Sequence, residues 1–359
     1  MVDWDLAVAT GTRLVRPGPQ IPRAEAHAAV AELRACAAVA QDHVRAFTGL
    51  DARGGSSEVA VIDRPGWIRA NADGFRTILT PVVAKLQEKQ KKQPSPVAEL
   101  VGPRLTGIET GSLLALLSTK VLGQYELFPP YGAAASAPQG RLLLVAPNIV
   151  QAEQEMGVDP SDFRLWVCLH EETHRVQFGA NPWLREYLVG EVGRFLEATE
   201  VDPAEMLKRL RAVLGSVSDA LRGNGDGESL VEAIQSPQQR EVLARLTAVM
   251  SLLEGHADVV MDGVGPSVVP SVAHIRAQFS KRRQNASRAE MVLRRLLGFE
   301  AKLKQYRDGA KFVRGVIDEV GMEGFNRIWT SPETLPLPTE IHDPKAWVVR
   351  VHGTTAASA

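Results

Sequence analysis

The sequence has only two cysteines, no long apolar run and almost no net charge. Cys36 and Cys168 are too few for a disulfide framework, and Cys168 lies in an apolar stretch where a small buried thiol is expected. No stretch approaches about eighteen consecutive apolar residues, the length that a membrane span needs. Lys and Arg number 41 against 42 Asp and Glu, giving a net charge of -1. This balance does not favour a general binder of nucleic acid or of anionic membranes.

The N-terminus also lacks the marks of a secretory signal. Met1-Val2-Asp3-Trp4-Asp5 carries acidic residues where a signal peptide would carry Lys or Arg, and no apolar h-region follows. The sequence therefore predicts a cytoplasmic protein. Its 359 residues, 45% of them hydrophobic, are enough to bury a large core in one large domain or two.

Apolar residues recur at helical spacing over most of the chain, while strand-like runs are short. The runs that begin at Val59 and at Arg141 are bounded by turn residues and predict strands; residues 124–132 read as irregular. The expected fold is thus mainly α with a small β-sheet. A polar segment broken by prolines at 88–96 suggests an N-terminal helical region over 1–96 and a catalytic region over 97–330. A Pro-rich, loop-like tail would follow over 331–359, its last seven residues disordered, although the whole chain could also form one compact unit.

The most informative motif is Leu169-His170-Glu171-Glu172-Thr173-His174, which contains the H-E-x-x-H pattern within a helical stretch. Positions four apart lie on one face of a helix, so His170 and His174 can direct ring nitrogens at one metal ion. Two solvated histidines on a helix surface would be the alternative. The apolar residues that flank the motif argue against it, because imidazoles on a core-facing stripe need partners. One zinc ion per chain is therefore predicted.

A catalytic zinc usually takes three protein ligands. The extended motif with a third histidine is excluded, because Gln177 and Ala180 occupy the required positions. We expect Glu254 to be the third ligand, since it interrupts an apolar helical stretch and a buried carboxylate needs a compensating charge. Gly255 beside it would allow a close approach to the helix of the two histidines. Asp258, one turn on, would accept the second N–H of a ligating imidazole.

Glu191 is the alternative third ligand, on a helical stripe with Leu184, Leu188 and Phe195, but it lacks an acidic partner one turn later.

Glu171 is predicted to be the general base, which takes a proton from the water that attacks a carbonyl and later protonates the leaving amine. His256 and Tyr306 are weak candidates for a residue that binds the substrate or stabilises the oxyanion. A structural role is the alternative for each.

These residues predict a zinc-dependent peptidase that acts on a peptide or protein substrate, with no nucleic-acid or membrane partner. A zinc-binding hydrolase that does not cleave peptides, or a metal-stabilised interaction protein, would carry the same ligands. A di-iron site is set aside, because it needs a second Glu-x-x-His pair and the sequence has none.

Several segments resemble a bacterial family of uncharacterised zincin-like metallopeptidases, some of whose members carry a label that associates them with deazaflavin-cofactor biosynthesis. The similar segments span most of the chain: Asp159 to Phe178, Pro182 to Arg185, Leu122 to Tyr125, Glu254 to Asp258, Lys304 to Gly309 and Phe325 to Trp329. The resemblance implies a mainly helical, zincin-type catalytic core with a glutamate as the third ligand. It implies no particular substrate.

Overall fold

The structure is a computed structural model that describes residues 2–52, 59–89, 96–127, 140–198, 236–284 and 299–353. For residues 81–89, 96–101, 196, 283–284 and 299–307 it describes the backbone alone. The helix expected at 202–214 and the residues of the tail after 353 lie outside the described residues.

Contacts divide the chain into two compact units. The first consists of Met1–Arg185 and Val260–Arg282, and the second of Glu186–Val259 and Arg283–Ala359. The first unit therefore extends across the boundary that the sequence suggested after residue 96. The second unit extends across the boundary suggested after residue 330. The chain passes from the second unit back to the first within one helix, α10 (Pro237–Val264).

The first unit contains a three-stranded sheet in the order β1-β3-β2. β3 (Arg141–Val145) is central, pairing in parallel with β1 (Val59–Ile62) and antiparallel with β2 (Gly123–Glu126). The strands predicted at Val59 and Arg141 are confirmed. β2 corrects the expectation of an irregular segment at 124–132: a four-residue strand with one glycine and two polar residues gives almost no strand pattern.

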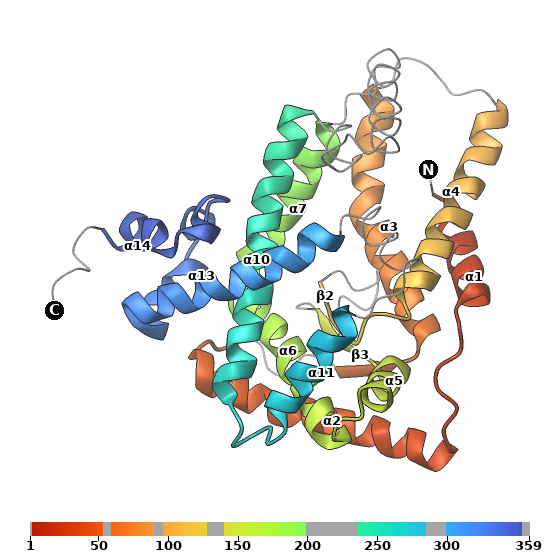
Figure 1. Cartoon of the computed structure of the whole chain (residues 1–359). Helices are drawn as coiled ribbons and strands as arrows, with labels where there is room; N and C mark the ends of the chain where they lie inside the picture. Colours follow the sequence, from red (N-terminus) through yellow and green to blue (C-terminus); the bar gives the residue numbers. More distant parts are fainter. Residues whose placement is uncertain are drawn as a thin grey trace, which may run out of the picture. The chain divides into compact units, whose positions relative to one another are not determined.

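Helices cover both faces of this sheet (Figure 1). Leu142 and Leu144 point from β3 into a core shared with α2 (Arg23–Thr48), α5 (Ala146–Met156) and α6 (Pro160–Ala180). Val145 points the other way, into a core with α1 (Trp4–Leu14), α3 (Arg64–Lys89) and α4 (Pro96–Leu117). The alternation is the two-residue period of a strand buried on both faces. α11 (Val272–Gln284) completes the first core.

The second unit is built on long helices. It holds most of α7 (Pro182–Glu197) and of α10, and α13 (Phe299–Phe325). A capping box starts α10: the Ser236 backbone N–H donates to Gln239 Oε1 (2.9 Å), and the Gln239 N–H donates to Ser236 Oγ (3.1 Å).

The region after residue 330 is structured, which corrects the expectation of a loop-like tail. It forms two short 3-10 helices, η3 (Pro332–Thr334) and η4 (Glu340–His342), and then α14 (Pro344–His352). A further 3-10 helix, η2 (Asn326–Trp329), comes just before this region. Trp347 of α14 is fully buried and donates its indole N–H to the Thr334 carbonyl (2.8 Å). Prolines at the first positions of η3 and α14 start these helices instead of excluding them.

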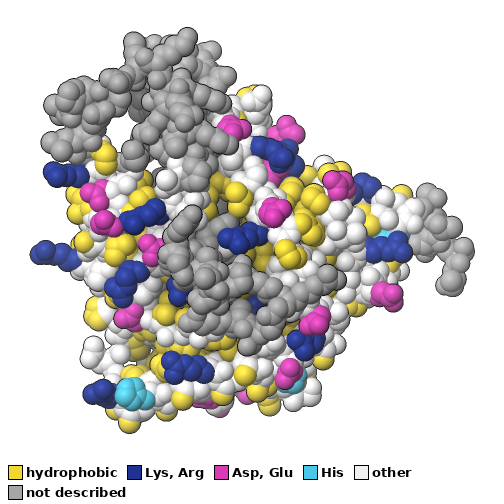
Figure 2. Space-filling model, turned by 180° about the vertical axis from the view of Figure 1, so that it is seen from behind, with side chains coloured by type: hydrophobic (Ala, Val, Ile, Leu, Met, Phe, Trp, Pro, Cys, Tyr) yellow, Lys and Arg dark blue, Asp and Glu magenta, His cyan; other side chains and the backbone are white. Residues whose placement is uncertain are grey.

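Charged side chains of both signs are interspersed over the described surface in Figure 2. This distribution agrees with the net charge of -1. Among the described residues, no helix is both long and apolar enough to cross a bilayer.

Candidate metal centre

The H-E-x-x-H residues lie in the middle of α6, a 21-residue helix packed into the first core. The side chain of Asp159 caps its N-terminus, accepting from the Asp162 N–H (2.9 Å), and Pro160 occupies the first helical position. Asp162, in the first turn, accepts from the Ser271 N–H (2.7 Å). Cys168 is buried as predicted, with its Sγ 3.7 Å from the Leu33 carbonyl oxygen, and burial raises the pKa of its thiol.

His170 and His174 direct their Nε2 atoms at each other. The two nitrogens are 3.2 Å apart, and the rings are perpendicular with centroids 4.8 Å apart. Both side chains are partly buried. The predicted convergence of the two imidazoles on one face of the helix is therefore present.

The other nitrogen of each ring faces an acceptor, which fixes the tautomer. His174 Nδ1 lies 2.9 Å from Gln177 Oε1, and His170 Nδ1 lies 3.3 Å from the thioether sulfur of Met261. An amide oxygen and a thioether sulfur only accept hydrogen bonds, so each Nδ1 carries the proton. Each Nε2 of a neutral imidazole then presents a lone pair to the other.

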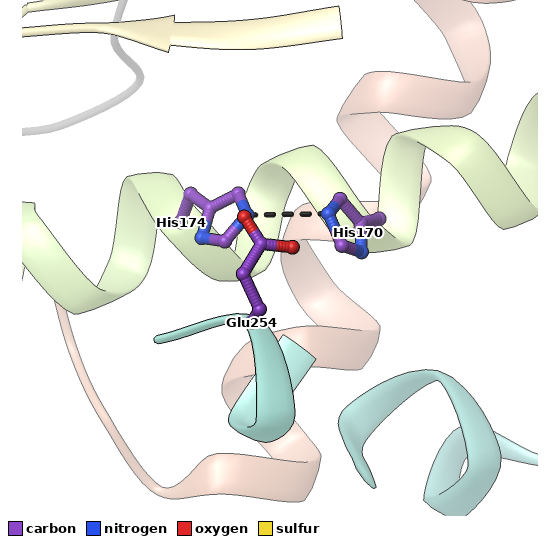
Figure 3. A group of neighbouring side chains, drawn as sticks. All are labelled: His170, His174 and Glu254. Atoms are coloured by element: carbon purple, nitrogen blue, oxygen red, sulfur yellow. Dashed lines mark hydrogen bonds between the residues drawn. The ribbon is translucent and has the colours of Figure 1, made fainter. Parts of the chain in front are cut away.

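Glu254 faces the same point from α10 (Figure 3). It lies seven residues before Met261, so the two side chains share one face of the helix, and Met261 is in contact with His170. A carboxylate oxygen of Glu254 and one ring nitrogen each of His170 and His174 all lie within 4.8 Å of one another. The three residues that the sequence selected are thus brought together.

This group fits a divalent cation. Two unprotonated imidazole nitrogens 3.2 Å apart repel each other, because their lone pairs face each other, unless a positive charge lies between them. Two nitrogens bound to one tetrahedral zinc are separated by about 3.3 Å, which agrees with the observed distance. The two-histidine, one-carboxylate donor set is also one of the sets that catalytic zinc uses.

Glu171 is buried, and its carboxylate lies against β2. A Cβ built on Gly123 would lie 2.6 Å from Glu171 Cγ, 2.7 Å from Cδ and 2.8 Å from Oε1. The next residue, Glu172, forms an ion pair with Arg175 in which both side chains are buried. Burial raises the pKa of Glu172, and Arg175 acts in the opposite direction.

Glu191, the rival ligand, has other partners. It is buried between Arg194 of its own helix and Arg245 of α10, whose Nη2 lies 3.0 Å from Glu191 Oε2. Two guanidinium groups compensate its charge, so its burial needs no metal.

The remaining predicted residues, His256, Asp258 and Tyr306, are not members of the group formed by His170, His174 and Glu254. His256 is fully buried between the rings of Phe325 and Trp329, at centroid distances of 5.2 and 5.4 Å, in keeping with the structural alternative. Asp258 is half-buried on α10, one turn after Glu254. Gln177 and Met261 are the acceptors that face the Nδ1 atoms, the position expected for Asp258. Tyr306 belongs to α13, and its side chain lies outside the described residues.

Gly255 allows a close approach, although to a different helix from the one expected. A Cβ on Gly255 would overlap the backbone of Gly309 in α13, and a Cβ on Gly309 would overlap the backbone of Ser251. Sequence reasoning therefore selected the three residues that the structure brings together, but it missed Gln177, Met261 and Gly123. Only Gln177 left a signal, as a polar residue one turn after His174.

Comparison with known proteins identifies the family of this chain. The chain matches the zincin-like metallopeptidases over residues 2–348. It belongs to that family. A solved structure described as a "putative hydrolase with a novel fold" from Chloroflexus aurantiacus is 29% identical, covers 98% of this chain and 99% of its own, and superposes with a TM-score of 0.69. No curated protein matches. The family and this neighbour support a hydrolase, and the family implies dependence on zinc.

Proposed function

We propose that this protein is a zinc-dependent metallopeptidase, with His170, His174 and Glu254 holding one zinc ion per chain and Glu171 acting as general base. The observation that carries the proposal is the convergence of two imidazole nitrogens and a carboxylate on one point. Glu171 directly follows the first of these histidines in α6. Bound zinc supplies Lewis-acid activation, which acidifies water and polarises a carbonyl.

The residues of this chain account for the proton transfers. Glu171 takes the proton from the attacking water and then delivers it to the leaving amine as the carbon–nitrogen bond breaks. The water oxygen ends on the new carboxyl group, so the products are a carboxylic acid and an amine. Met261 and Gln177 hold the two imidazoles with their Nε2 atoms directed at the proposed metal position.

The sheet edge supports an extended peptide as the substrate. The Val145 N–H donates to the Leu122 carbonyl (2.8 Å), which makes Gly123 and Leu144 a non-hydrogen-bonded pair. Gly123 and Tyr125 therefore direct their N–H and C=O groups away from β3, toward the outer side of β2. A peptide added along that side would pass beside the Glu171 carboxylate.

The test is a peptide-library cleavage assay with the purified full-length chain, coupled to measurement of its zinc content. We expect cleavage that a chelator stops and zinc restores. Glu171→Gln should keep the zinc and lower kcat by about 10²–10⁴-fold, because it removes the general base.

Two outcomes would contradict the proposal. Zinc-loaded protein that cleaves no peptide but hydrolyses another amide or ester would indicate a hydrolase of a different class. Zinc-loaded protein without hydrolytic activity, whose partner binding survives Glu171→Gln, would indicate an interaction protein. The cytoplasmic location stays a prediction.

A further inference from the structure

The glycine at position 123 stands where a side chain would overlap the predicted general base. The three nearest atoms to a Cβ at 123, at 2.6 to 2.8 Å, belong to the Glu171 side chain: Cγ, Cδ and Oε1. Real Cβ atoms do not approach other heavy atoms this closely. A residue with a side chain at 123 would therefore displace the carboxylate or the strand.

Space, and not backbone conformation, explains this glycine. Six glycines of the described chain have a positive φ angle, and Gly123 is not among them. It lies within a regular strand, where glycine weakens pairing and is typical of a close approach by another group. Alanine would fit the backbone here, and the nearest atoms that oppose it belong to the Glu171 side chain.

The strand is fixed against α6 at a second point, which limits its freedom to move away. Tyr125 lies two residues after Gly123, on the same face of β2, and its ring stacks on Phe178 with centroids 6.0 Å apart. Phe178 lies seven residues after Glu171, on the same face of α6. β2 is held from its other side by pairing with β3.

We propose that Gly123 is a positioning residue for Glu171. Because residue 123 has no side chain, the Glu171 carboxylate packs directly against the backbone of β2, and this contact orients it. The consequence for turnover rests on the proposed function, since it requires Glu171 to be the base. The steric part of the inference does not depend on the reaction.

The steric part is tested by thermal unfolding of four forms of the full chain: wild type, Gly123→Ala, Glu171→Ala and the double variant. Overpacking of a buried contact should lower the Tm of Gly123→Ala by about 4 °C relative to wild type. Glu171→Ala removes all three overlapping atoms. In that background Gly123→Ala should change the Tm by less than about 1 °C. An equal loss in both backgrounds would overturn the proposal.

Gly190→Ala is the matched control, because a Cβ at that position meets nothing within 4 Å. It should leave the Tm unchanged or slightly raised, as expected for alanine in a helix. A Tm loss in Gly190→Ala as large as that in Gly123→Ala would show a general effect of replacing glycine and would contradict the proposal.

The functional part is tested on Gly123→Ala by kinetics and by zinc competition with a chelator. We expect kcat to fall by about 100-fold with KM little changed, since a small misplacement of a catalytic group has this effect. Zinc affinity should stay within about 2-fold of wild type, because the ligands are not touched. Wild-type kcat would overturn the positioning role. If the wild type cleaves no peptide, the proposed function fails while the unfolding result still decides the steric part.

Discussion

Two glutamates on helices of the second unit, the buried Glu191 and the half-buried Glu254, differ in what compensates their charge. Glu191 is enclosed by the guanidinium groups of Arg194 and Arg245. Glu254 faces the ring nitrogens of His170 and His174. Arg245 and Glu254 belong to the same helix, α10, so one element supplies a cation to the first carboxylate and a carboxylate to the metal group. Burial alone therefore does not identify a metal ligand. The identity of the partners does.

The largest expected effect comes from exchanging these two carboxylates for alanine. Glu254→Ala should lower zinc affinity by more than about 100-fold, beyond the range seen for groups outside the ligand shell. Glu191→Ala should keep full zinc occupancy. Metal analysis after dialysis against a weak chelator measures both. Zinc loss in Glu191→Ala with full occupancy in Glu254→Ala would reverse the comparison.

The next effect concerns stability rather than zinc. Glu191→Ala leaves two arginines without their shared carboxylate, and Arg194 is largely exposed while Arg245 is partly so. Water can therefore solvate both in part, and we expect a loss of about 1–3 kcal/mol in the free energy of unfolding. Urea denaturation of the zinc-loaded protein measures it. If Arg245→Met in the Glu191→Ala background recovered none of this loss, the absence of the Glu191 carboxylate from Arg245 would not be its cause.

The smallest effects should come from the groups that orient the histidines. Gln177→Ala removes an amide acceptor from His174 and should lower zinc affinity by about 10-fold or more. Met261→Leu removes a weaker acceptor from His170 while keeping the apolar volume, so a smaller decrease is expected. Chelator competition titrations rank the two. A larger effect of Met261→Leu would mean that packing of α10 against His170, and not the hydrogen bond, holds the site.

The sequence determined the helical character of the chain and two of the three strands in its described part, and it selected the residues that the structure brings together in one group. Periodicity fixed these features because helix position i and position i+4 meet regardless of the rest of the fold, as with His170 and His174. The cost of burying an unpaired carboxylate pointed to Glu254 from its apolar neighbours alone. The sequence did not predict the strand β2, because its four residues show no clear period. It did not predict the helix α14 either, because a proline at a helix start resembles a loop residue.

Only the tertiary structure showed which groups surround Glu191 and Glu254, because their partners include residues from distant parts of the chain. It also decided the neighbours of two glycines. Gly255 lies against Gly309 of α13 instead of the histidine helix, and Gly123 lies against Glu171. A glycine has no side chain from which its neighbour could be inferred, so what occupies the space beside it is fixed by how strands and helices pack.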